Sequence, residues 1–192
     1  MIINGIKVFV ITLVICSYYL LAQDNFECSR LVTGLAQKDF HSKSPGETSI
    51  AYQYNDNITQ NLEKRLIEKT IHKSISWAKD KDLQTLYDII ANDSNYTEVQ
   101  PGNRVVHGFN EFKKAEDFWM SSEFKAIKYE IRDLKINISK SGESAWWYCV
   151  LDDINEWKGR PANWENTRWT GVLEKRNGKW IIVQMHFSFA SK

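Results

Sequence analysis

Residues 164–189 read WENTRWTGVLEKRNGKWIIVQMHFSF, and this stretch decides the fold. Two apolar segments rich in β-forming residues flank the pair Asn177-Gly178. An Asn-Gly pair in this setting is the strongest short-range signal for a two-residue turn, because both residues tolerate positive φ. The stretch therefore predicts an antiparallel β-hairpin.

Both arms of the predicted hairpin alternate between two faces, because side chains two residues apart lie on the same side of a strand. The more apolar face should meet the core; it carries Trp169, Gly171, Leu173, Ile181, Val183, Met185, Phe187 and Phe189. The opposite face carries Arg168, Thr170, Val172, Glu174, Trp180, Ile182, Gln184, His186 and Ser188. The second face is too apolar for open water, so we expect another subunit to cover it. The prediction is a homodimer with Arg168, Gln184 and His186 at the interface.

Upstream of the hairpin, the spacing of apolar residues predicts three helices. Over 58–78 apolar residues recur every three or four positions, which is typical of an amphipathic helix. Asp80 or Asp82 should cap a second helix that continues to about Ile90. A third helix should begin near Asn110.

Strand signals fill the rest of this region. Short strands are expected around 96–99 and 104–108, separated by a Pro101-Gly102 turn. From 127 to 138 the period is two, with a phase slip near Asp133 that predicts a β-bulge. Residues 145–151 are apolar on both faces, which indicates a central strand. This order predicts an α+β cone, with about three helices packed on a strongly curved antiparallel sheet around a cavity.

The hairpin also carries a resemblance to a known family. The motifs Arg168-x-Thr170-x-Val172, 177–183 (NGKWIIV) and His186-x-Ser188 resemble the SnoaL-like branch of the NTF2-like superfamily, whose fold is a ketosteroid isomerase-type cone. Residues 175–183 are similar to the association domain of calcium/calmodulin-dependent kinases. That domain has arginines in its cavity, where this chain has Gly171 and Phe187. The resemblance therefore implies a more apolar cavity that does not favour an anionic ligand.

The N-terminal residues have the composition of a targeting segment. Lys7 precedes a continuous apolar run, and Leu20-Leu21-Ala22 precedes polar residues. We expect 1–22 to be a secretory signal peptide cleaved after Ala22, which predicts a periplasmic or secreted protein without membrane attachment. An uncleaved N-terminal anchor is the alternative. Residues 23–57 should form a polar extension, and 58–190 the SnoaL-like domain.

Charge and cysteine content limit the partners. A formal net charge of +1 gives no reason to expect nucleic acid or an anionic membrane surface. Cys28 and Cys149 could pair in an oxidising compartment, or Cys149 could be a buried lone thiol. No Cys/His spacing suits a metal site, and no motif calls for a cofactor.

Three functions remain open on sequence alone. The abundance of Trp favours a binding module whose cavity holds a small, largely apolar molecule. An isomerase, dehydratase or cyclase would need a general base, for which Asp93 and His107 are the candidates. The third is an oligomeric assembly module, as the kinase resemblance implies. The residues expected to line the cavity are Tyr96, Trp119, Trp147, Trp169 and Met185.

Overall fold

The computed structural model describes residues 45–190, with side chains described from Asn57 onward. The expected signal peptide, most of the expected polar extension and Cys28 lie outside this range. Residues from Asn55 onward form one compact unit. Within the described range, no helix is long and apolar enough to cross a membrane.

The first described helix is longer than predicted. Helix α2 spans Pro45–Asp80, so it begins within the segment expected to be an extension. Proline is favoured in the first turn of a helix, and neither Pro nor Gly interrupts the residues after Gly46. Helix α3 follows at Leu83–Tyr87, and its N-cap Asp82 accepts a hydrogen bond of 3.0 Å from the backbone N–H of Thr85. Of the two predicted capping residues, Asp80 and Asp82, the structure therefore shows Asp82 in this role.

The predicted third helix is three short pieces. Helix α4 covers Phe109–Phe112, the 3₁₀ turn η1 covers Lys113–Ala115, and helix α5 covers Glu116–Met120. The tighter 3₁₀ turn changes the angular spacing of the side chains around the axis. Phe112 and Trp119 pack with ring centroids 4.8 Å apart across the break, so the irregular helix still supplies an aromatic surface.

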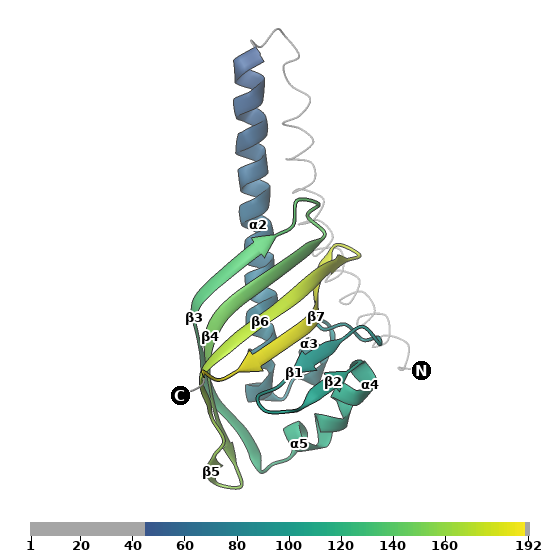
Figure 1. Cartoon of the computed structure of the whole chain (residues 1–192), viewed down its shortest axis with the longest axis vertical. Helices are drawn as coiled ribbons and strands as arrows, with labels where there is room; N and C mark the ends of the chain where they lie inside the picture. The colour runs from purple at the N-terminus through teal and green to yellow at the C-terminus, as the bar shows by residue number, and fades with distance from the viewer. Residues whose placement is uncertain (1–44, 191–192) are drawn as a thin grey trace, which may run out of the picture. The chain divides into compact units, whose positions relative to one another are not determined.

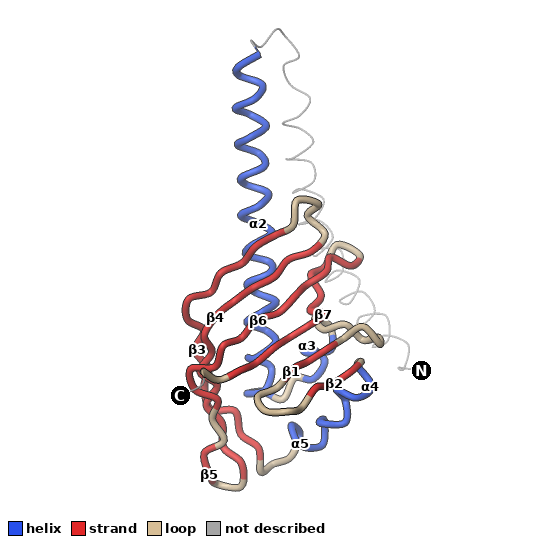
Figure 2. Tube along the Cα trace, viewed as in Figure 1, coloured by secondary structure: helices blue, strands red, loops and turns tan. Residues whose placement is uncertain are grey.

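The sheet has the strand order β2-β1-β7-β6-β4-β3, with the short β5 paired to β4 (Figures 1 and 2). Neighbouring strands are antiparallel, except that β1 runs parallel to β7. The strands are β1 Thr97–Val99, β2 Val105–His107, β3 Phe124–Ile138, β4 Ser144–Trp157, β5 Arg160–Pro161, β6 Trp164–Arg176 and β7 Lys179–Ser188. The predicted α+β architecture is confirmed, and β4 is an interior strand paired on both sides, although it lies next to the edge strand β3.

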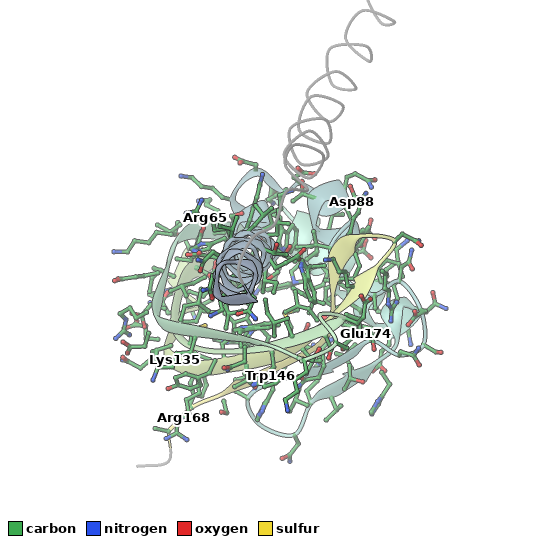
Figure 3. The ribbon with its side chains drawn as sticks, turned by 90° about the horizontal axis from the view of Figure 1, so that it is seen from above. Arg65, Asp88, Lys135, Trp146, Arg168 and Glu174 are labelled. Carbon is green, nitrogen blue, oxygen red and sulfur yellow. The ribbon has the colours of Figure 1, made fainter. Side chains whose placement is uncertain are left out.

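Bulges bend this sheet into a half-barrel. The β3–β4 register shifts between Arg132 and Lys135, and Asp133 has a φ of 55°. This confirms the bulge predicted from the phase slip. A bulge adds an unpaired residue to one strand and increases the local twist and bend. Seen end-on, α2 lies within the curve of the sheet (Figure 3), where Ile67 and Ile71 enter the core.

The final hairpin forms as predicted, but one of its arms changes face. Asn177 and Gly178 have φ values of 51° and 76°, as a two-residue turn requires. Val172 pairs with Gln184, whereas Leu173 pairs with Ile182, so Val183 is an extra residue in β7. Trp180 and Ile182, predicted on the outer face, are instead 4% and 0% exposed in the core. The prediction was wrong there because a bulge reverses the alternation beyond it.

Two tryptophans and a glycine organise the core of the sheet. Trp147 and Trp169 pack edge-to-face with centroids 5.4 Å apart, and Trp169 stacks on Phe187. The Trp147 indole lies directly over Gly171. Nearby Cys149 is a fully buried free thiol whose pKa burial raises to about 12. At neutral pH this thiol therefore stays protonated and acts as a small apolar side chain.

Glu63 joins α2 to the hairpin. Its carboxylate accepts hydrogen bonds of 2.6 Å from Lys175 Nζ and 2.6 Å from Trp180 Nε1. Partial burial acts to raise the pKa of Glu63, but these bonds and the Lys175 charge outweigh it and lower the pKa. A lowered pKa means that this contact stabilises the fold above the ordinary pKa of Glu and is lost as the pH falls through the folded-state value.

Candidate functional site

A cavity of about 590 Å³ lies between the last turns of α2, the β1–β2 turn, the α4–α5 region and the adjacent end of the sheet. This volume is within the range of small-molecule sites. Most of the wall is apolar, and seven aromatic side chains contribute to it: Trp77, Phe112, Phe118, Trp119, Phe124, Trp164 and Phe187.

The aromatic side of the cavity is held by ring-to-ring packing. Trp77 and Trp119 pack edge-to-face at 5.4 Å, and Trp119 also contacts Phe112. The indole N–H of Trp77 donates to the backbone carbonyl of Ser74 at 3.1 Å, so it is already satisfied. Such interlocked rings form a preorganised apolar surface suited to a ring-containing ligand.

One carboxyl group faces this apolar wall. Asp153 on β4 is half-buried and lines the cavity, and burial raises its pKa, an effect that a hydrogen bond with Asn155 partly offsets. Among the side chains described, those of residues 57–190, it forms no ion pair. Asn155 also lines the cavity and is only 8% exposed, yet its Oδ1 atom has no hydrogen-bond partner. Together they make a polar spot in a mostly apolar wall.

A second acid in the wall is already engaged. The Glu98 carboxylate accepts bonds from the Tyr96 hydroxyl at 2.8 Å and from Gln100 Nε2 at 2.6 Å. Burial and the adjacent Glu98 charge raise the pKa of Tyr96 well above its ordinary value. Tyr96 therefore stays protonated and donates a hydrogen bond to Glu98, so this carboxylate is occupied by contacts within the β1 segment.

The predicted cavity residues divide into two groups. Trp119 and Met185 line the cavity. Tyr96, Trp147 and Trp169 are buried in the core and are not among the lining residues. Trp147 and Trp169 point inward as the alternation predicts, but each fills space against the other and against Gly171. Inward orientation alone does not separate a core residue from a cavity residue.

The two predicted general bases lie outside the cavity. Asp93 accepts a bond from the backbone N–H of Asn95 at 2.8 Å and pairs with Arg176 at 2.7 Å, and these contacts lower its pKa. His107 is exposed on the opposite face of the sheet, beside Thr97. Neither residue is among those that line the cavity, so their positions do not support the role of base.

Sequence reasoning missed Asp153, although a signal was present. Residues 145, 147, 149 and 151 point inward in β4, and 153 continues the same parity. A carboxylate at an inward position of an apolar strand needs either a partner or a functional reason. The alternation of β4 could therefore have singled out Asp153 among its neighbours.

The raised pKa of Asp153 predicts an unusual effect of removing its charge. Since the folded state binds this proton more tightly than the unfolded state, ionisation destabilises the fold as the pH rises through the folded-state pKa. Asp153→Asn should stabilise the protein at pH 7 by about 1 kcal/mol, because the amide carries no charge to desolvate. The gain should vanish below about pH 4, near the ordinary pKa of Asp. Urea unfolding at both pH values measures it.

The neighbouring carboxylate supplies a matched control. The backbone N–H of Asn166 and the Arg132 guanidinium, at 2.6 Å and 2.8 Å, lower the pKa of Asp152. Asp152→Asn should therefore destabilise the protein at pH 7 and lose this effect in acid. If both substitutions shifted stability in the same direction, the conclusion that burial destabilises the ionised form of Asp153 would be wrong.

The outer face of the sheet holds the predicted interface residues. In one row across the strands, Trp146 on β4 pairs with Val172 on β6, which pairs with Gln184 on β7. The next row aligns Tyr148, Thr170 and His186. Trp146 is 48% exposed, and it lies with Arg168 on the side turned away from α2 (Figure 3). Apolar and polar side chains thus share one exposed surface.

Among the described residues, no group of three or more His, Cys, Asp or Glu side chains could hold a metal ion.

Comparison with known proteins identifies related folds. Residues 67–192 match the family model described as a SnoaL-like domain, whereas none of the curated proteins matches the chain. A candidate dehydratase of the NTF2-like family from Streptomyces avermitilis superposes with a TM-score of 0.60 at 15% identity, covering 69% of this chain and 99% of its own. A candidate scytalone dehydratase from Novosphingobium aromaticivorans gives 0.62 at 15% identity, covering 70% and 89%.

A third similar structure belongs to a different functional class. It is a candidate calcium/calmodulin-dependent kinase II association domain from Exiguobacterium sibiricum, with a TM-score of 0.56 at 5% identity, covering 67% of this chain and 94% of its own. At such identities the likeness concerns the fold alone, because folds of this kind carry unrelated functions.

Proposed function

The chain belongs to the SnoaL-like domain family, and from this premise we propose that its cavity binds a small, largely apolar molecule. The family assignment and the NTF2-like fold confirm the resemblance seen in the C-terminal hairpin. The observation that carries the proposal is the cavity of about 590 Å³ with seven aromatic side chains in its wall. Burial of apolar ligand surface against such a wall supplies the driving force for binding.

A neutral fluorescent probe tests this proposal. N-phenyl-1-naphthylamine, an apolar molecule with three aromatic rings, should bind the wild-type protein with one site per chain and increased emission. Trp119→Ala removes an aromatic wall residue and should weaken binding about tenfold, which corresponds to about 1.4 kcal/mol. Titration followed by probe fluorescence measures the affinity of the wild type and of the Trp119→Ala variant.

The control is Trp146→Ala, which removes the same side chain from the outer face. It should leave the affinity for the probe within about twofold of the wild type. Absence of probe binding to the wild-type protein would refute the proposed function. Equal affinity in the Trp119→Ala variant would show that the probe binds elsewhere.

Asp153 favours a second candidate function, acid–base catalysis of an isomerase or dehydratase type. A carboxyl group whose pKa is raised by an apolar site is suited to take up and return a proton. Two of the similar structures are candidate dehydratases, which makes this chemistry a reasonable one to test. In this proposal Asp153 is the proton carrier and Asn155 holds the polar group of the substrate.

Native mass spectrometry of the protein purified from its own host tests both the catalytic function and the cellular location of the protein. A small mass released from each subunit would identify the molecule on which to compare turnover by the wild type and Asp153→Asn. If that molecule were unchanged by the wild-type protein, the catalytic candidate would fail and binding alone would stand. A mature chain beginning at Gln23 would support the proposed periplasmic or secreted location, and a full-length chain would contradict cleavage.

We also propose that the outer face of the sheet forms a homodimer. Trp146, Tyr148 and Val172 are large apolar residues that remain exposed there. Arg168, Gln184 and His186 share this face and would provide polar contacts around them. An interface with an apolar centre and a polar edge is the usual arrangement.

A further inference from the structure

Two basic side chains of the cavity wall are unpaired. Arg104 follows the β1–β2 turn and Lys114 belongs to η1, and both line the cavity while remaining exposed. Exposed residues of a cavity wall lie where the cavity meets solvent. Among the side chains described, neither of these two forms an ion pair or a side-chain hydrogen bond.

Several other basic residues of the domain have partners. Five of them pair with carboxylates: Lys125, Arg132, Lys158, Lys175 and Arg176. Lys113, adjacent to Lys114, lies over the rings of Tyr87 and Phe109. Lys81 donates to backbone carbonyls. Within the described side chains, other basic residues, such as Arg65 and Lys140, are also unpaired, but Arg104 and Lys114 are unpaired cations that line the cavity. Two free cations at the opening of a largely apolar cavity indicate a site for a negative charge.

The part of the wall on β4 favours a hydrogen-bond donor on the ligand. Asn155 offers a buried oxygen without a donor, and it lies beside the half-buried carboxyl of Asp153. An unsatisfied buried acceptor costs free energy that a donor on a ligand would recover. The cavity is therefore apolar through most of its wall, with an acceptor on β4 beside Asp153, the carboxylate of Glu98 engaged by Tyr96 and Gln100, and cations on the β1–β2 turn and η1.

We infer that the ligand is an organic monoanion with an apolar ring body and a hydroxyl or N–H group. Its charge lies at Arg104 and Lys114, its rings contact Trp77 and Trp119, and its donor reaches Asn155. The inference rests on the proposed function and specifies its substrate class. Of the two positions at which the resemblance implied cavity arginines, Gly171 lies under Trp147 and Phe187 lines the cavity, so in this chain the cations come from other segments. The sequence-based expectation against an anionic ligand considered only those two positions.

A pair of probes that differ by one charged group tests the inference. 1-Anilinonaphthalene-8-sulfonate carries a sulfonate on the ring system of the neutral N-phenyl-1-naphthylamine. The double variant Arg104→Gln/Lys114→Gln should weaken binding of the sulfonate about fivefold to tenfold and change binding of the neutral probe by less than twofold. Raising the salt concentration should reduce the wild-type preference for the sulfonate, because exposed charges are screened.

Two further variants serve as controls. Arg65→Gln/Lys140→Gln removes the same two types of cation from exposed positions that do not line the cavity, and it should alter neither affinity. Arg104→Lys/Lys114→Arg keeps both charges and should keep the affinity for the sulfonate. Thermal unfolding of each variant checks that the fold is intact.

The outcomes separate the two proposals. If the neutral probe binds the cavity but the sulfonate affinity is unchanged in the double variant, the anionic ligand class is wrong and the proposed function stands. If both probes weaken equally, the cations shape the cavity and do not select charge, which also overturns the inference. If the neutral probe does not bind the wild type at all, the proposed function itself fails.

Discussion

Gly171→Ala is expected to destabilise the domain by about 3 kcal/mol or more, the upper end of the range for overpacked cores. A Cβ at this position would lie 2.0 Å from Cη2 of Trp147 and 2.5 Å from the backbone carbonyl oxygen of Gln184. Trp147 cannot move aside easily, because it is only 2% exposed and packs against Trp169. The carbonyl of Gln184 belongs to the neighbouring strand, so its displacement would disturb the β6–β7 ladder.

Urea unfolding followed by tryptophan fluorescence measures this loss. Gly142→Ala is the matched control, since a Cβ there meets nothing within 4 Å and the only cost is a positive φ of 75°. That cost should be about 1 kcal/mol. Equal stability losses at the two positions would mean that Trp147 does not pack over Gly171 as described.

Trp146→Lys is expected to convert the proposed dimer to monomers, with a rise of more than about a hundredfold in the dissociation constant. In a two-fold symmetric interface the same patch meets itself, so the substitution introduces two like charges in place of apolar contact. Trp146 lies beside Val172 in the exposed row of the outer face. Sedimentation velocity over a range of concentrations measures the association.

Leu62→Lys is the control for this experiment. Leu62 is also a large exposed apolar residue, but it belongs to α2, so its replacement should leave the dimer intact. Dissociation by Leu62→Lys and not by Trp146→Lys would assign the interface to the helix. A wild-type particle larger than a dimer would instead favour an assembly module.

The local sequence was sufficient to predict most of the sheet. The Asn177-Gly178 turn, the inward set of Trp169, Gly171 and Leu173, and the bulge at Asp133 all follow from patterns within a few residues. These features depend on φ preferences and on the period of two along a strand, which neighbouring residues determine. The family resemblance rests on the same hairpin, and the matched family model confirms it.

The prediction from strand alternation was wrong in β7, where the pairing between β6 and β7 determines which face each side chain occupies. Nothing in Trp180-Ile181-Ile182-Val183 reveals that Val183 is the extra residue, because all four side chains suit either face. The bulge is fixed by the register that joins Val172 to Gln184 and Leu173 to Ile182. The phase slip at Asp133 was visible because polar and apolar residues alternate clearly around it.

By itself, the sequence determined the curved sheet, the hairpin and the family of this protein, because local conformational preference and strand periodicity fix them. Only the tertiary structure decided which inward residues line the cavity and which fill the core. Trp147 and Trp119 are both large aromatic residues, yet one packs over Gly171 and the other borders the cavity. Likewise, Arg104, Lys114 and Asp153 come together only when the β1–β2 turn, η1 and β4 meet. Such a site depends on contacts between segments far apart in the chain, which no local pattern encodes.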